Sequence, residues 1–254
     1  MNEMKGNSMA VFNSNDIYPV SADSELPFEQ HRDIFHLTGI DQEETILLLY
    51  PHSKDDKTRE ILFIRKSDNH TKVWEGEKLS KKQANELSGI DSIYLIDDFK
   101  DILSSIATKV DTFYINKNEH YRANSPVETR EDRFISWLLK KYPAHNVAKS
   151  NPILQRQRSV KHPDEVDQIK KACDITRRGF NRVLEFIKPN VWEYEIEAEF
   201  IHEFINSSSK GFAYSPIIAS GNDNNVLHYI KNNKQCKSGE LILMDVGAEY
   251  GHYS

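Results

Sequence analysis

Short apolar runs alternate with polar and helical stretches along the first half of this chain. Apolar runs bounded by turn-forming residues are typical of buried strands, and apolar residues at helical spacing predict helices. The strands at 45–50 and 60–65 are expected to form a hairpin, and the alternation indicates a mixed α/β layer structure. The pattern predicts strands at 9–12, 45–50, 60–65, 92–96 and 112–115, and helices at 29–37, 80–87 and 98–108.

A further helix and a polar stretch come next. Ser125 is the expected N-cap of this helix and Pro126 its first residue, since serine accepts a backbone hydrogen bond there and proline needs no donor. The stretch 151–161 is polar and basic and has no clear periodicity. We therefore place a domain boundary within it, with an α/β amino-terminal domain over residues 1–153 and a second domain over residues 154–254.

Two amphipathic helices open the second domain. Pro163 begins a long helix that Pro189 ends, and residues 193–205 form the next one. Strands are predicted at 215–220 and 226–230, around a turn rich in glycine and asparagine. Helices followed by strands indicate an α+β layer in this part of the chain.

The last stretch of the chain carries the most informative side chain. Four apolar residues, Leu241 to Met244, run directly into Asp245. A short apolar run of this kind predicts a strand buried on both faces. A carboxylate at its end must be paired, hydrogen-bonded or bound to a metal. Asp245 is therefore either a turn residue that accepts backbone hydrogen bonds or a hard ligand for a divalent cation.

Composition narrows the class of protein. The chain has 254 residues, 38% of them hydrophobic and 28% charged, as expected of a globular protein. A net charge of −6 argues against nucleic acid as the main partner. The apolar runs are too short to span a membrane, and no signal peptide is visible. Two distant cysteines fit a reducing compartment, so we expect a cytoplasmic protein.

Other candidate chemistry has weaker support. His202-Glu203 begins like a zinc-binding helix, but Asn206 stands where the second histidine is needed. His228 lies in a strand-like run and is either a structural residue or an acid, base or ligand. Tyr214 and Tyr229 are interpreted as core or rim aromatics. The glutamates of the second amphipathic helix are interpreted as solvated charges: Glu193, Glu195, Glu197 and Glu199.

Several separated motifs together resemble the Xaa-Pro aminopeptidases (aminopeptidase P). This family belongs to the "pita-bread" metallopeptidases, with prolidase and methionine aminopeptidase. The resemblance covers nearly the whole chain, in the order that the family has. Its motifs are Pro27 to Gly39, Trp74-Glu75-Gly76, Val160 to Glu165, Gly211 to Gly221, Leu227-His228-Tyr229 and Asp245 to Tyr250.

The resemblance implies a metal-dependent active site. The family holds two divalent metals, usually Mn²⁺, with two Asp, one His and two Glu, and Asp245 matches the first of these ligands. The other ligands would lie beyond Ser254, so the chain is expected to be an amino-terminal fragment that is inactive alone. His228 matches a catalytic histidine that contacts substrate, and Tyr214 matches a tyrosine of the same substrate pocket.

The expected fold is therefore an amino-terminal domain of the creatinase/aminopeptidase P type, followed by the first part of a pita-bread domain. The expected parent reaction releases the N-terminal residue from peptides with proline in second position, and the family resemblance implies a homo-oligomer. One alternative is prolidase, which takes only dipeptides. Another is a non-catalytic pita-bread module that binds peptides or histones, because a fold does not determine function.

Overall fold

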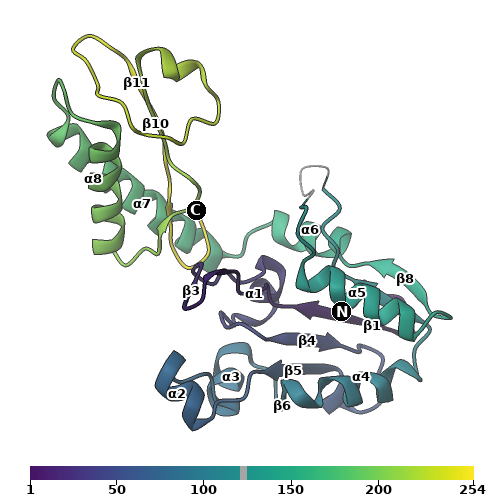
Figure 1. Cartoon of the computed structure of the whole chain (residues 1–254). Helices are drawn as coiled ribbons and strands as arrows, with labels where there is room; N and C mark the ends of the chain where they lie inside the picture. The colour runs from purple at the N-terminus through teal and green to yellow at the C-terminus, as the bar shows by residue number, and fades with distance from the viewer. Residues whose placement is uncertain (121–124) are drawn as a thin grey trace. The chain divides into compact units, whose positions relative to one another are not determined.

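Two compact units make up the chain. A computed structural model describes residues 1–120 and 125–254, which divide into Met1–Ser159 and Val160–Ser254 (Figure 1). The first unit extends past residue 153, because Asn151–Ser159 is a helix, α6, whose Leu154 is buried in the core of that unit. None of the helices in the described residues is long and apolar enough to cross a membrane.

The first unit is built on a six-stranded mixed sheet with the order β6-β5-β4-β1-β7-β8. β4 is antiparallel to β1 and β5, whereas the β1–β7, β5–β6 and β7–β8 pairs are parallel. The sheet confirms the predicted strands and hairpin. Its strands are β1 (Ser8–Asn13), β4 (Ile46–Leu49), β5 (Glu60–Ile64), β6 (Ser92–Leu95), β7 (Thr112–Ile115) and β8 (Asn146–Lys149), and β2 (Pro19–Ser21) and β3 (Ser24–Glu25) form a separate hairpin.

Helices cover both faces of this sheet, so the unit has three layers. Alternate side chains of β1 point to opposite faces, and all six of its residues are buried. One face packs against α1, α3 and α6 and the other against α4 and α5. The bounds of these helices are α1 (Arg32–Thr38), α2 (Asn69–Glu75), α3 (Lys81–Ser88), α4 (Phe99–Ala107) and α5 (Arg130–Lys141), and two short 3₁₀ turns are η1 (Asp56–Thr58) and η2 (Ile96–Asp98).

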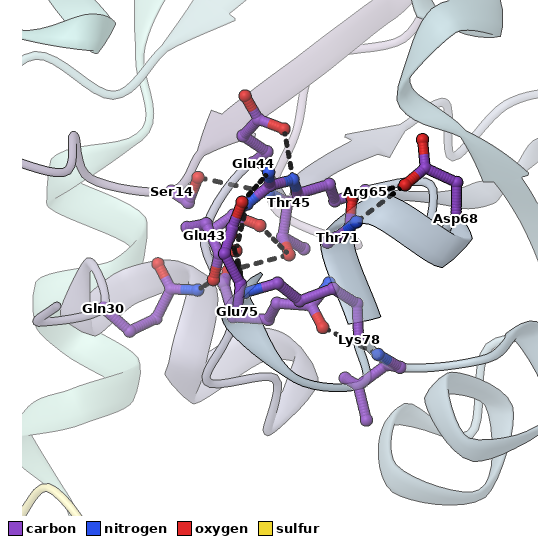
Figure 2. A network of polar contacts seen from close by, with 12 residues as sticks. Ser14, Gln30, Glu43, Glu44, Thr45, Arg65, Asp68, Thr71, Glu75 and Lys78 are labelled. Carbon is purple, nitrogen blue, oxygen red and sulfur yellow. Dashed lines mark hydrogen bonds and ion pairs between the residues drawn. The ribbon is translucent and has the colours of Figure 1, made fainter. Parts of the chain in front are cut away.

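A network of charges holds α2 against the strand ends. Glu43 is only 8% exposed, and its carboxylate pairs with Arg65 at 2.8 Å and Lys78 at 2.7 Å. Arg65 also reaches Glu44 at 3.3 Å and Glu75, the last residue of α2, at 2.5 Å (Figure 2). Burial alone would raise the pKa of Glu43, but the two cations outweigh it and hold that pKa below its ordinary value.

The structure differs from two local expectations for the first unit. The helix predicted after Ser125 begins at Arg130 instead, because Thr129 forms a capping box with Asp132. The stretch from 151 is helical despite its polar composition, and Leu154 and the partly buried Ile153 pack it against the core of the first unit. Trp74 of the Trp74-Glu75-Gly76 motif lies on α2 and is 76% exposed.

The second unit is organised by two packed helices, α7 (Pro163–Phe186) and α8 (Glu193–Asn206). Both confirm the predicted helices. Gly179 of α7 lets the two approach closely, because a Cβ there would lie 2.7 Å from the Phe204 ring and 2.9 Å from the Phe200 ring. The remaining elements are β9 (Gly211–Phe212), β10 (Ile217–Ser220), η3 (Gly221–Asn225), β11 (Ile242–Asp245) and β12 (Ala248–Glu249), in two-stranded pairs β10–β11 and β12–β9.

Two strand predictions for this unit are corrected. Residues 226–230 form a turn and extended chain after η3 and no strand. The Tyr229 amide donates to the Val226 carbonyl within this turn, and Val226, Leu227 and His228 are exposed. The run before Asp245 is a strand but is not buried on both faces. Leu241 is 80% and Leu243 42% exposed, since among the described residues β11 pairs only with β10 and its residues alternate between half-buried and exposed.

Replacing Glu43 with glutamine is expected to lower the free energy of unfolding at pH 7 by about 2 kcal/mol, as for a hydrogen bond to a charged group. A carboxylate with a lowered folded-state pKa stabilises above its ordinary pKa, 4.5 for glutamate, and loses that contribution as pH falls through the folded value. Urea titrations between pH 3 and pH 7 should therefore show the difference only at the higher pH. Glu86→Gln, in an exposed pair on α3, is the matched control, and an equal loss there would refute the role of the network.

Gly179→Ala should destabilise the second unit, although alanine favours a helix. The added methyl group would overlap the Phe200 and Phe204 rings. Overpacking of this kind costs about 1–3 kcal/mol, against about 1 kcal/mol gained in helix propensity. Thermal unfolding of this variant can be compared with Asn181→Ala, at an exposed position of the same helix. A midpoint equal to that of the control would show that the helices adjust to the methyl group.

Candidate functional site

Tyr214 and Asp245, two of the residues singled out in the sequence, lie together in the second unit. Asp245 ends β11, and Tyr214 lies in the segment between β9 and β10, the strand that pairs with β11. The Tyr214 hydroxyl donates a hydrogen bond of 2.7 Å to Asp245 Oδ1. This bond orients the carboxylate, which is exposed and not buried as the sequence pattern predicted.

Gly247 makes room for this contact. A Cβ at residue 247 would lie 3.3 Å from the Tyr214 ring, so the ring rests directly on the backbone after Asp245. Partial burial and the adjacent Asp245 carboxylate together raise the pKa of Tyr214 to about 12. The phenol therefore stays protonated at neutral pH and acts as a donor to the carboxylate.

His228, the third residue, lies at the exposed end of a loop. It follows η3, and its imidazole forms no hydrogen bond or ion pair with another residue of the described ranges 1–120 and 125–254. The next residue, Tyr229, is buried at 7% exposure. The loop is thus anchored beside His228 while the imidazole itself remains accessible. Its assignment as a catalytic or substrate-binding residue stays a prediction.

The anchor of this loop is the buried carboxylate of Glu193, the first residue of α8, which is fully buried at 0% exposure. Its Oε1 accepts hydrogen bonds from the Ser220 amide at 2.8 Å and hydroxyl at 2.7 Å. Its Oε2 accepts from the Tyr229 hydroxyl at 2.7 Å and the Lys234 amide at 2.9 Å. Burial and this carboxylate raise the pKa of Tyr229. Four donors thus compensate for burying the charge.

Asn232 fixes the loop a second time. It is 3% exposed and adopts a left-handed backbone with φ 43°, a conformation that asparagine tolerates better than most residues. Its side chain accepts from the Ile218 amide at 3.0 Å and donates to the Pro216 carbonyl at 3.0 Å. The loop that carries His228 is therefore bound to β10 and to the segment that precedes it.

Sequence reasoning missed Glu193 and Asn232. Glu193 was interpreted as a solvated charge, and this is wrong. Glu193 shares its helix and its spacing with Glu195, which accepts from a backbone amide at the exposed helix start, so no sequence signal separates the two. The distinction arises only because the chain from Ser220 to Lys234 folds back over the start of α8.

A metal would find one suitable ligand among these residues. An exposed carboxylate is a hard oxygen donor of the kind that Mn²⁺ and Mg²⁺ prefer, and Asp245 has one oxygen oriented by Tyr214. However, among the residues that the structure describes, no group of three or more His, Cys, Asp or Glu side chains could hold a metal ion. Asp245 fits a metal site as one of its ligands, and these residues alone do not complete one.

Family models match both parts of the chain. Residues 1–114 match the aminopeptidase P N-terminal domain, and residues 167–254 match metallopeptidase family M24. The order of these matches confirms the expected fold, an α/β amino-terminal domain followed by the start of a metallopeptidase domain.

Individual relatives agree with these matches. The chain is 29% identical to the Xaa-Pro aminopeptidase of Escherichia coli, over 92% of this chain and 53% of the relative. It is 27% identical to human Xaa-Pro aminopeptidase 3, over 94% and 47%. A structure of zinc-substituted E. coli aminopeptidase P in complex with product has a TM-score of 0.85 and 27% identity, over 98% of this chain and 57% of that one. The chain spans about half the length of the curated relatives it matches.

Glu193→Gln should destabilise the second unit and loosen the loop. The amide nitrogen cannot accept, so at least one pair of donors loses its acceptor, at about 1–3 kcal/mol for each buried group left unpaired. Urea unfolding should show the loss, and hydrogen exchange should accelerate at the amides of Ser220 and Lys234. Glu185→Gln, at an exposed position of α7, should change neither. Unchanged protection of both amides in Glu193→Gln would show that this carboxylate does not hold the loop.

Proposed function

We propose that this chain, which belongs to the aminopeptidase P family of metallopeptidases, forms part of an enzyme that releases the N-terminal residue from peptides with proline in second position. The observation that carries the proposal is the oriented, exposed carboxylate of Asp245 beside Tyr214, within the part of the chain that matches the metallopeptidase model.

Asp245 is the proposed metal ligand. Its Oδ1 accepts from Tyr214, whereas no residue of the described part of the chain is bonded to its Oδ2. That oxygen is available to one of two divalent cations, with Mn²⁺ as the proposed metal, and ligands from outside these 254 residues would complete the site. Such cations supply Lewis-acid activation of a water molecule and of the scissile carbonyl. Tyr214 would keep the carboxylate in one orientation and line the substrate pocket.

His228 is the proposed catalytic residue that contacts substrate. Glu193 holds the loop beside it through Tyr229, so the exposed imidazole is presented at a constrained position. From there it can donate a proton or hydrogen bond to the substrate as charge develops on the carbonyl oxygen. The bond before proline is a tertiary amide without an N–H. Recognition of proline therefore depends on a surface that fits its ring.

The cellular setting is proposed from the same chemistry. Both cysteines, Cys173 and Cys236, are free, which fits a reducing compartment such as the cytoplasm. The partners are peptides, and we propose a homo-oligomer because the family resemblance implies one. The net charge of −6 argues against nucleic acid as a partner.

Activity is expected to depend on Asp245 and His228 in different ways. Hydrolysis of Ala-Pro-Ala with Mn²⁺ should be measured on the complete gene product, alongside bound metal and thermal midpoint. Asp245→Asn should abolish activity and reduce bound metal with little change in midpoint, because the amide keeps the shape of the side chain but lacks its charge. His228→Ala should lower kcat about 10²–10³-fold and leave bound metal unchanged. The 254-residue chain alone should be inactive.

Other results would replace the proposal. Full activity and metal content in Asp245→Asn would make Asp245 a structural turn residue. Metal loss in His228→Ala would make His228 a metal ligand. Hydrolysis of Ala-Pro but not Ala-Pro-Ala would indicate prolidase, and peptide binding without hydrolysis would indicate a binding module. Exposed Lys170→Ala, on α7 and in an exposed pair with Asp167, is the control for nonspecific effects.

A further inference from the structure

A polar cavity of about 500 Å³ lies in the first unit, at the carboxyl ends of the neighbouring parallel strands β1 and β7. The segment after β1, the segment after β7, the start of α5 and the N-cap of α1 all contribute to its wall. β1 is joined to β4 on one side and β7 on the other. Crevices at the carboxyl ends of strands, where the chain diverges to the two sides of a sheet, are the usual ligand sites of α/β sheets.

The acidic side chains of this cavity are already engaged by donors of the protein. Asp16 accepts from the Arg130 amide at 2.7 Å and from the Arg133 guanidinium at 2.5 Å. Asp132 accepts from the Thr129 hydroxyl at 2.7 Å and its amide at 3.2 Å. Glu131 Oε2 accepts from Asn13 at 2.7 Å, its buried Oε1 has no partner among the described residues, and burial raises the pKa of this carboxyl group.

The principal cation of the cavity is not engaged in this way. The Arg130 guanidinium forms no hydrogen bond or ion pair with any residue in the described ranges, and it is half-buried. Burial lowers the pKa of Arg130 and outweighs the opposing effect of the Glu44 and Asp16 carboxylates. Glu44 is itself paired with Arg65 at 3.3 Å. A half-buried guanidinium is normally paired with a group of opposite charge. The missing internal partner of Arg130 in the described part of the chain therefore points to an anionic ligand.

His31 adds a second donor. Its Nδ1 accepts a hydrogen bond of 3.3 Å from the Asp33 amide, which places the proton of the neutral ring on Nε2. Burial lowers the pKa of His31 despite the nearby Asp33 carboxylate, so the ring is neutral at pH 7. No described residue accepts from Nε2. The Arg130 guanidinium and His31 Nε2–H are therefore donors without an acceptor among the described residues, in a cavity where Glu131 Oε1 is a carboxylate oxygen without a donor.

We propose that this cavity binds the carboxylate or phosphate group of a small organic anion, with the Arg130 guanidinium as its anchor and His31 Nε2–H as a second donor. A guanidinium matches the two oxygens of either group bidentately. Because the cavity of about 500 Å³ is larger than inorganic phosphate, the ligand carries an organic part beyond its anionic group. This site is independent of the proposed peptidase activity, since all of its residues lie in the first unit.

Binding can be measured on the 254-residue chain. Isothermal titration at constant ionic strength would use inorganic phosphate and succinate as probes, with neutral glycerol as a control. We expect saturable binding of at least one anion and none of glycerol, and the ratio of the two affinities tells whether phosphate or carboxylate is preferred. Arg130→Gln should weaken binding about tenfold or more, as loss of a charged hydrogen bond does. The backbone bond to Asp16 survives in this variant.

Two further variants separate the site from general charge effects. Arg177→Gln removes the same charge from an exposed pair on α7 and should not alter binding. His31→Asn keeps an N-cap acceptor but removes the Nε2 donor, and it should weaken binding even if Arg130→Gln fails to fold. In the wild type, the Nε–Hε resonance of Arg130 should shift on titration. Absence of saturable binding, or equal affinities in Arg130→Gln and Arg177→Gln, would overturn the proposal.

Discussion

The second unit depends on one buried carboxylate. Glu193 begins α8, yet its four hydrogen-bond donors come from the end of β10 and from the loop that follows η3. A buried charge is tolerated only when its donors are all in place, so the helix start, the strand end and the loop must fold together. The same bonds leave His228 exposed beside an anchored Tyr229. A requirement of folding thereby also positions the predicted catalytic residue.

The charged side chains of the first unit form two different arrangements. Around Glu43, cations and carboxylates pair with one another and join α2 to the strand ends. At the carboxyl ends of β1 and β7, the acids are bonded internally while Arg130 has no bonded anion among the described residues. The first arrangement accounts for stability, because each buried group has its partner. The second presents unused donors to a cavity, which is the property expected of a binding site.

Some residues of the candidate site were predicted from the sequence and others were not. Asp245 and Tyr214 were found through motifs, and the structure joins them by a hydrogen bond across the paired segments of β10 and β11. The interpretation of Asp245 as a buried charge was wrong, because in the described part of the chain β11 pairs with one strand only, β10. The burial of Glu193 could not be predicted from the sequence, since a glutamate in an amphipathic helix has the same local pattern whether water or a folded loop surrounds it.

The sequence by itself determined the order and type of most elements and the family of the chain. Apolar periodicity and turn residues act within a few positions of one another, so five of the six strands of the sheet and the helices α7 and α8 were predicted from short windows, whereas the edge strand β8 was not predicted. Only the tertiary structure decided which charges are buried and which remain open. The burial of Glu193 and the unpaired Arg130 depend on segments far apart in the chain, and such contacts leave no local signal.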